Sequence, residues 1–290
     1  MDLHTITGIV RPTSRADLGR LGPGDAVLAG GTLLFSDPHT HLRRLVDLNA
    51  LGWTPITVHP DGPDAGIEIA ATCTIAELGG TNLPVEWLAR PLIRQCCEAF
   101  LASFKIHRFG TVGGNLCLAY PAGPMISLTA ALHGICTVWS PDGGDYRLPV
   151  ADFVTGNCTT VLRPGEVLRS IFLPAAALGS RTAFRKIALS PLGRSGAVII
   201  GRRDGAGLEI TLTAATVRPV LLCFAAFPDL AELAGAISAL PRTIWHDDPH
   251  GPPDWRAHVS AVLAEQIRVE LAAQTPAAQA PAEEAGQEAS

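Results

Sequence analysis

Two pairs of adjacent glycines stand in similar surroundings in this sequence. Gly30 and Gly31 lie in the stretch VLAGGTLL, and Gly113 and Gly114 lie in GTVGGNLC. Glycine adopts positive φ and lets the backbone approach a ligand, so the N–H groups of such a loop can converge on phosphate oxygens. A single pair more often forms a tight turn, but two such loops would hold a pyrophosphate from both sides.

The polar neighbours of the glycines fit the same chemistry. Thr32, Thr111 and Asn115 would add side-chain hydrogen bonds, and a helix after either loop would add the positive end of its dipole. The stretch from Arg108 to Met125 contains no acid that would repel a dianion. Neither glycine pair fits G-x-G-x-x-G or G-x-x-x-x-G-K-[ST], which excludes a Rossmann fingerprint and a P-loop.

The elements that must position these loops follow from periodicity and turn signals. A strand and turn at 26–32 and a strand at 44–51 form a small α/β unit. A larger unit follows, with a strand at 67–73, helices at 74–78, 91–103 and 125–134, and a hairpin at 135–150 around PDGGD. A third unit has β-rich runs at 183–189, 196–203 and 208–217 and helices at 230–240 and 255–273.

Composition limits the class of protein. The 290 residues are 47% hydrophobic and only 17% charged, against about 25% charged in typical domains, so we expect a partner subunit to cover part of the surface. No apolar run reaches the ~18 residues of a membrane span, and the first residues do not form a signal peptide, so a cytoplasmic location is expected. The net charge of −5, without a basic block, argues against nucleic acid and favours a small ligand.

The seven cysteines include no C-x-x-C pair. Disulfides, zinc and iron–sulfur clusters within this chain are therefore not expected, and buried thiols in a reducing compartment are the better interpretation. Cys96 and Cys97, with His107 further on, raise the question of a thiolate nucleophile. Both cysteines fall in an apolar helix, where inert buried thiols are expected.

Three other polar clusters have ordinary structural explanations. The stretch HDDPH at 246–250 has metal-competent groups, but Asp and His before a helix are ordinary turn and capping residues. His39 and His41 are interpreted as polar loop residues beside the ligand cleft rather than as metal ligands. Arg202 and Arg203 are expected in a turn between strands.

Several stretches together resemble one known family. They are AGGT at 29–32, KIHRFGTVGGNL at 105–116, TTVLRPGEVLRSIFLP at 159–174, AFRKIALSPLGRSGAVIIG at 183–201 and DDPHGPPDWRAHVSAVL at 247–263. In this order they resemble the FAD-binding medium subunit of the molybdenum hydroxylases, the family of xanthine dehydrogenase and aerobic carbon monoxide dehydrogenase. The resemblance extends to about residue 272.

The resemblance implies an α+β fold in two domains. A two-part FAD-binding domain of the vanillyl-alcohol-oxidase (PCMH) type would occupy residues 1–176, with subdomains at about 1–58 and 59–176. A small C-terminal α+β domain, an antiparallel sheet plus helices, would occupy 177–272. The stretch 273–290 lacks large apolar residues and is expected to be a disordered tail.

The resemblance also implies which residues bind FAD. The first loop would contribute Ala29, Gly30, Gly31, Thr32 and Leu33, and the second Thr111, Val112, Gly113, Gly114 and Asn115. Leu162, Phe184 and Lys186 would lie near the isoalloxazine ring. No catalytic residue and no metal ligand is expected in this chain.

The sequence departs from the family in the segment after the second glycine pair. Relatives commonly carry Asp-Pro-x-x-Asp there, and the corresponding residues here are Tyr120 to Pro124, so both acids are absent. The second acid is expected to hydrogen-bond FAD, which Pro124 cannot do. Phe109 also replaces a basic residue of the family pattern, and the cysteine-rich insertion of some relatives is missing.

The function implied is electron transfer. A large partner with the molybdenum cofactor would oxidise the substrate, and a small partner would pass electrons through two [2Fe–2S] clusters to FAD in this chain. A dimer of heterotrimers is the usual assembly. The alternatives are a stand-alone flavin oxidoreductase and an assembly subunit that has lost FAD.

Overall fold

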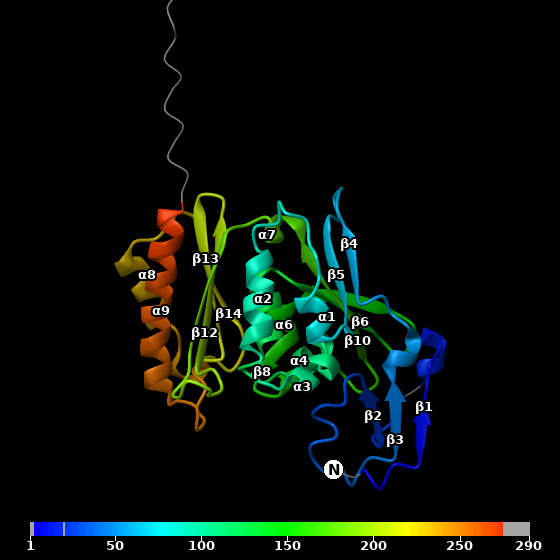
Figure 1. Ribbon diagram of the computed structural model, residues 1–290. Helices are drawn as coiled ribbons and strands as arrows, with labels where there is room; N and C mark the ends of the chain where they lie inside the picture. The colour runs from blue at the N-terminus through cyan, green and yellow to red at the C-terminus, as the bar shows by residue number, and fades with distance from the viewer. Residues whose placement is uncertain (1–2, 20, 275–290) are drawn as a thin grey trace, which may run out of the picture.

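The computed structural model describes residues 3–19 and 21–274. Figure 1 shows the elements arranged in layers, with the two C-terminal helices on one side, then a sheet, then a group of helices, then a second sheet. A smaller sheet built from the N-terminal residues lies at one end of this stack. The part of the chain before residue 53 is therefore set apart from the layers, and it packs against them through its loops.

The N-terminal unit is a three-stranded parallel sheet with the strand order β1-β3-β2. Its central strand buries Leu45 and Val46, and Arg44 forms a 2.6 Å ion pair with Asp25 of the neighbouring strand. β2 ends just before the first glycine pair. The elements are β1 (Gly8–Val10), the 3-10 helix η1 (Arg15–Leu18), β2 (Asp25–Leu28), β3 (Arg44–Asp47) and the 3-10 helix η2 (Leu48–Leu51).

A five-stranded antiparallel sheet forms the second unit, with the strand order β4-β5-β10-β6-β7. The predicted hairpin at 135–150 is confirmed as β6 and β7. β4 pairs with β5, so the second unit begins before Ile56, slightly earlier than the predicted division at 58/59. The strands are β4 (Ile56–His59), β5 (Gly66–Ala70), β6 (Ile135–Trp139), β7 (Asp145–Pro149) and β10 (Val167–Pro174).

Helices cover one face of this sheet. Thr74 caps the first of them through a capping box with Glu77. The long helix predicted at 91–103 is wrong in extent, because Phe100 leaves helical geometry with ψ 98° and the chain starts a new helix after Ser103. The helices are α1 (Ile75–Gly79), α2 (Arg90–Ala99), α3 (Phe104–Phe109), α4 (Val112–Leu118) and α5 (Pro124–Ala131).

The C-terminal unit is a four-stranded antiparallel sheet packed between two layers of helices. α9 buries Val259, Leu263, Ile267 and Leu271, as their helical spacing predicts. α5, buried along its whole length, covers the other face of the sheet. Three of these strands are predicted from the sequence, and the fourth, β14, is not. The elements are β11 (Thr182–Ile187), β12 (Ala197–Asp204), β13 (Gly207–Thr213), β14 (Val220–Phe224), α8 (Leu230–Ser238) and α9 (Pro253–Ala273).

Short elements connect these units. They are α6 (Val150–Phe153), β8 (Val154–Gly156), β9 (Thr159–Thr160), α7 (Ala175–Leu178) and the 3-10 helix η3 (Arg242–Ile244). The predicted domain boundary at 176/177 lies within α7. Within the described ranges, none of the helices is both long and apolar enough to span a membrane. From residue 275 on, the predicted disordered tail lies outside the described residues.

A buried ionic cluster joins the second unit to the C-terminal unit. Arg202 was predicted in a turn, but it lies within β12 directly opposite Glu209, because the hairpin turns only at Gly205. The Arg202 guanidinium is 3.2 Å from the Glu209 carboxylate, and both side chains are buried. His133, which follows α5, approaches the same carboxylate at 2.6 Å.

The protonation of Glu209 should therefore affect stability. Burial alone would raise its pKa, but the hydrogen bond with His133 and the charge of Arg202 outweigh burial, and its pKa lies below the ordinary value. A carboxyl group whose pKa is lower in the folded than in the unfolded state stabilises the fold at pH values above the unfolded-state pKa. This contribution is lost as the pH falls through the folded-state pKa.

We expect Glu209→Gln to lower the free energy of unfolding at pH 7 by about 3–5 kcal/mol, since the charge of Arg202 stays buried while the carboxylate is gone. The variant should also lose less stability than the wild type between about pH 5 and pH 3. Urea unfolding at both pH values measures this, with the exposed Glu86→Gln as the control. Equal pH dependence in wild type and Glu209→Gln would show that this carboxylate is not linked to folding.

Candidate functional site

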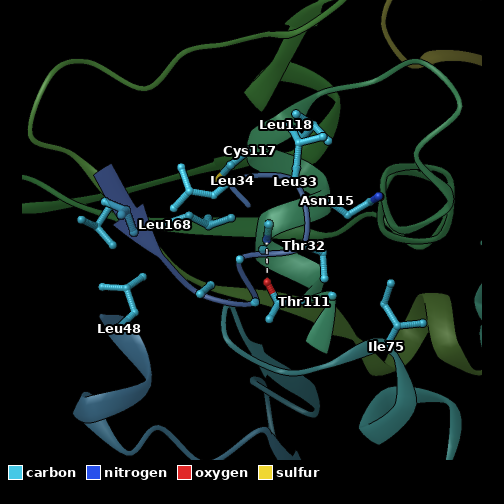
Figure 2. Close-up of a pocket in the computed structure, with 18 of the residues that line it drawn as sticks. Thr32, Leu33, Leu34, Leu48, Ile75, Thr111, Asn115, Cys117, Leu118 and Leu168 are labelled. Carbon is cyan, nitrogen blue, oxygen red and sulfur yellow. Dashed lines mark hydrogen bonds between the residues drawn. The ribbon is translucent and has the colours of Figure 1, made fainter. Parts of the chain in front are cut away.

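A cavity of about 360 Å³ opens between the N-terminal unit and the second unit. Both glycine loops line it, and most of the remaining wall is apolar. In Figure 2, Leu48 and Leu168 lie on one side of the first loop and Ile75 lies on the other. The walls are formed by Val27, Ala29, Gly30, Gly31, Thr32, Leu33, Leu34, Leu48, Ile75, Phe100, Gly110, Thr111, Gly113, Gly114, Asn115, Cys117, Leu118, Leu162, Glu166, Val167 and Leu168.

The first loop, residues 29–33, follows β2. A side chain at Gly30 is impossible without movement, since its Cβ would lie 1.8 Å from the carbonyl oxygen of Phe109. Gly31 has φ +68°, a conformation that favours glycine. Among the described residues, the backbone N–H groups of 30–34 find no protein acceptor. The first loop therefore presents unpaired donors beside the cavity, as an anion site requires.

The second loop, residues 111–115, forms the first turn of α4. The N–H groups of its residues 112–115 are already used: Val112 donates to the Cys73 carbonyl and Gly113 to the Ala71 carbonyl, at 2.8 and 3.0 Å. Gly114 donates to Thr111 Oγ1 at 3.0 Å, the bond dashed in Figure 2. Asn115 donates from its backbone to the Thr111 carbonyl. The expectation that both loops offer backbone donors is therefore wrong for residues 112–115 of the second loop.

The second loop instead offers close approach and one side chain. A Cβ on Gly113 would lie 2.6 Å from the backbone of Ala71, so this glycine lets α4 pack on the end of β5. Gly114 is exposed and lines the cavity. The side-chain oxygen of Asn115 accepts from the Met125 N–H at 3.1 Å. Its amide nitrogen has no acceptor among the described residues and is available to a ligand.

Most of the predicted site residues meet at this cavity. The first loop, Leu162 and four residues of the second loop line it, whereas Val112 is buried behind it. Phe184 and Lys186 do not line it. Both lie on β11, where Phe184 packs against the core of the second unit and Lys186 is exposed. The structure therefore does not bring these two residues to the loops.

Several cavity residues were missed from the sequence. In the sequence, four of them look like ordinary core residues, and only the fold brings them to the cavity. They are Leu48, Ile75, Phe100 and Leu168. Glu166, in the RPGE stretch, is buried and accepts hydrogen bonds of 2.8 Å from the Tyr146 hydroxyl and from a backbone N–H. Burial, together with the hydrogen bond to Glu166, raises the pKa of Tyr146.

The cysteines behave as predicted in the helical region. Burial raises the pKa of Cys73 and Cys97 to about 12 and raises that of Cys96 well above its ordinary value. His107 contacts the Phe100 carbonyl at 3.0 Å through its ring nitrogen. The prediction that Cys96 and Cys97 are buried is confirmed, whereas the expectation of buried thiols is wrong for Cys117, Cys158 and Cys223, which are exposed.

The stretch 246–250 has a structural role. Asp248 accepts from the His250 N–H at 2.8 Å and pairs with Arg256, which also donates to the carbonyls of Gly196, Ala214 and Gly251. These bonds confirm the predicted turn role of the segment. Across residues 3–19 and 21–274, no three His, Cys, Asp or Glu side chains are arranged to hold a metal ion.

The segment that departs from the family pattern lies at the contact with the C-terminal unit. Pro124 begins α5, and the Pro121 carbonyl accepts from the Ala214 N–H at 2.8 Å. The Arg194 guanidinium lies 5.6 Å from the centre of the Tyr120 ring. Tyr120 lines a separate polar cavity of about 250 Å³ with residues 246–250. His39 and His41 pack edge to face in the loop before β3 and line neither cavity.

The main cavity suits a ligand with a long apolar body and a dianionic centre. The unpaired amides of the first loop fit a pyrophosphate, and the glycine positions leave no room for side chains. Leu48, Phe100 and Leu168 offer apolar contact for aromatic rings. These features fit FAD, whose ring carries the redox chemistry while the protein anchors it.

Comparisons with known proteins agree with this geometry. Residues 7–176 match the family described as the FAD binding domain in molybdopterin dehydrogenase. The carbon monoxide dehydrogenase medium chain of Afipia carboxidovorans is 31% identical over 185 residues, 61% of this chain and 62% of that chain. The medium chain of Hydrogenophaga pseudoflava is 25% identical over 195 residues, 65% of each chain. The alignments thus span somewhat less than two thirds of these relatives.

A solved structure matches over a longer range. The reconstituted CO dehydrogenase from Oligotropha carboxidovorans superposes with a TM-score of 0.76 at 25% identity, covering 93% of this chain and 99% of that chain. The predicted α+β fold class and the family resemblance are confirmed. Because the family match covers more than half of the sequence, this chain belongs to the FAD-binding domain family of the molybdopterin dehydrogenases.

Proposed function

We propose that this chain is the FAD-binding electron-transfer subunit of a multi-subunit molybdenum hydroxylase. In this proposal a small partner with [2Fe–2S] clusters delivers electrons from a large partner that carries the molybdenum cofactor and oxidises the substrate. The assembly is a dimer of heterotrimers in the cytoplasm. The proposal is supported by the family match and by the similarity to CO dehydrogenase medium chains.

The main support for the proposal is that both glycine loops line one largely apolar cavity. The unpaired amides of residues 30–33 would hold the pyrophosphate, and the Asn115 side chain would donate from the opposite loop. Thr111 fixes the first turn of α4, and Leu162 with Leu168 would contact the ring system. When bound, FAD accepts and releases the electrons at its isoalloxazine ring.

The lining residues support a binding role for this chain in the proposal. Glu166 is the one carboxylate among them, and it already accepts hydrogen bonds from Tyr146, Ser140 and a backbone N–H. This suits a subunit that passes electrons and leaves the chemistry of the substrate to a partner.

Exposed apolar residues support the existence of partner subunits. Phe104 and Phe109 on α3 are 67% and 62% exposed, and Leu192 before β12 is 85% exposed. Large apolar side chains at such exposure are typical of surfaces that another chain covers.

Purification of the tagged chain from its native host tests the proposed function. We expect flavin absorbance together with an iron–sulfur chain and a molybdenum-containing chain in the same complex. A yellow protein that purifies alone with one FAD would support a stand-alone flavin oxidoreductase. A colourless protein that still binds its partners would support an assembly subunit and contradict FAD binding.

We expect Gly30→Ala to weaken FAD binding at least about tenfold, because the new Cβ would push the first loop away from Phe109. Titration of the apoprotein with FAD, followed by flavin fluorescence, measures the change in Kd. Gly235→Ala is the matched control, since its Cβ meets no atom within 4 Å and α8 should become slightly more stable. Wild-type affinity in Gly30→Ala would argue against the first loop as part of the FAD site.

A further inference from the structure

Asn49 links the end of β3 to the first glycine loop. It lies in η2, two residues after Asp47, and its side-chain nitrogen donates to the Ala29 carbonyl at 2.8 Å. The same nitrogen donates to Asp47 Oδ1 at 2.8 Å, and the backbone N–H of Asn49 donates to that oxygen at 3.1 Å. The Asn49 amide is thus held by Asp47 and in turn holds Ala29.

This contact fixes the direction of one peptide group. In a trans peptide the carbonyl of one residue and the N–H of the next point in opposite directions. Since the Ala29 carbonyl points to Asn49, the Gly30 N–H points away from Asn49. Gly30 lines the cavity, whereas Asn49 does not.

The same peptide is held from two further directions. Leu28, the last residue of β2, pairs with Asp47 in the parallel ladder, so the strand that enters the loop is attached to the residue that orients Asn49. On the other side, the Gly30 backbone lies against the Phe109 carbonyl with no space for a side chain. Rotation of the Ala29–Gly30 peptide would therefore break the Asn49 bond.

We propose that Asn49 is a positioning residue that aims the unpaired Gly30 N–H at an anionic group of the cavity's ligand. The inference rests on the proposed function, in which that group is the FAD pyrophosphate. Asn49 acts only through Ala29 and does not touch the ligand. An asparagine is suited to this place because its amide nitrogen can donate to Asp47 and to Ala29 at once.

The test uses Asn49→Asp, which keeps the shape of the side chain but cannot donate to Ala29, and Asn49→Ala as a second variant. Asn82→Asp is the matched control, since Asn82 is exposed and lines none of the cavities described above. Each full-length apoprotein is titrated with FAD, and phosphorus NMR of the FAD complex reports the surroundings of the pyrophosphate. Thermal unfolding without FAD reports stability.

We expect both Asn49 variants to bind FAD about tenfold more weakly, with shifted pyrophosphate resonances, whereas Asn82→Asp behaves as the wild type. A purely structural role would lower the thermal midpoint but leave the phosphorus spectrum of the bound cofactor unchanged. Wild-type affinity and an unchanged spectrum in both Asn49 variants would overturn the positioning role. Failure of the wild type itself to bind FAD would instead contradict the proposed function.

Discussion

The cavity depends on one backbone contact, that of Gly30 with the Phe109 carbonyl. This contact places the loop after β2 against the residues that lead into α4, although the two segments belong to different units. Any side chain at position 30 would separate them. The contact also explains why the glycine pair is needed even before a ligand is considered: Gly30 allows the close approach, and Gly31 takes the positive φ that turns the chain along the cavity.

The two glycine loops differ in which backbone donors are free. In the second loop, the amides of residues 112–115 are bonded within the protein, so this loop forms a rigid wall around the Thr111 cap. In the first loop, the amides of 30–33 are unpaired among the described residues. Donors held in place before the ligand arrives lose less entropy on binding. The rigid second loop and the contact at Phe109 keep the first loop in this arrangement.

The sequence predicted features that depend on local patterns. The glycine pairs, the PDGGD hairpin and the apolar spacing of α9 were readable because each is contained in a short stretch. Features that depend on contacts between distant parts of the sequence could not be predicted in this way. Phe100 leaves the helix and lines the cavity, Arg202 continues β12 because Glu209 stands opposite, and β11 directs Phe184 to the core. Two acceptors of the second loop, the carbonyls of Ala71 and Cys73, come from the end of a strand that is distant in the sequence, so local patterns did not reveal these bonds.

The central claim, that the first loop holds the pyrophosphate of FAD, is tested most directly by titrating the apoprotein with FAD and with FMN, which lacks the pyrophosphate and the adenylate. Charge-assisted hydrogen bonds contribute about 1.5–3 kcal/mol each. The account therefore predicts that FAD binds at least about 100-fold more tightly than FMN. Equal affinity for the two flavins would show that the glycine loops do not hold a pyrophosphate, and would contradict the assignment of the site.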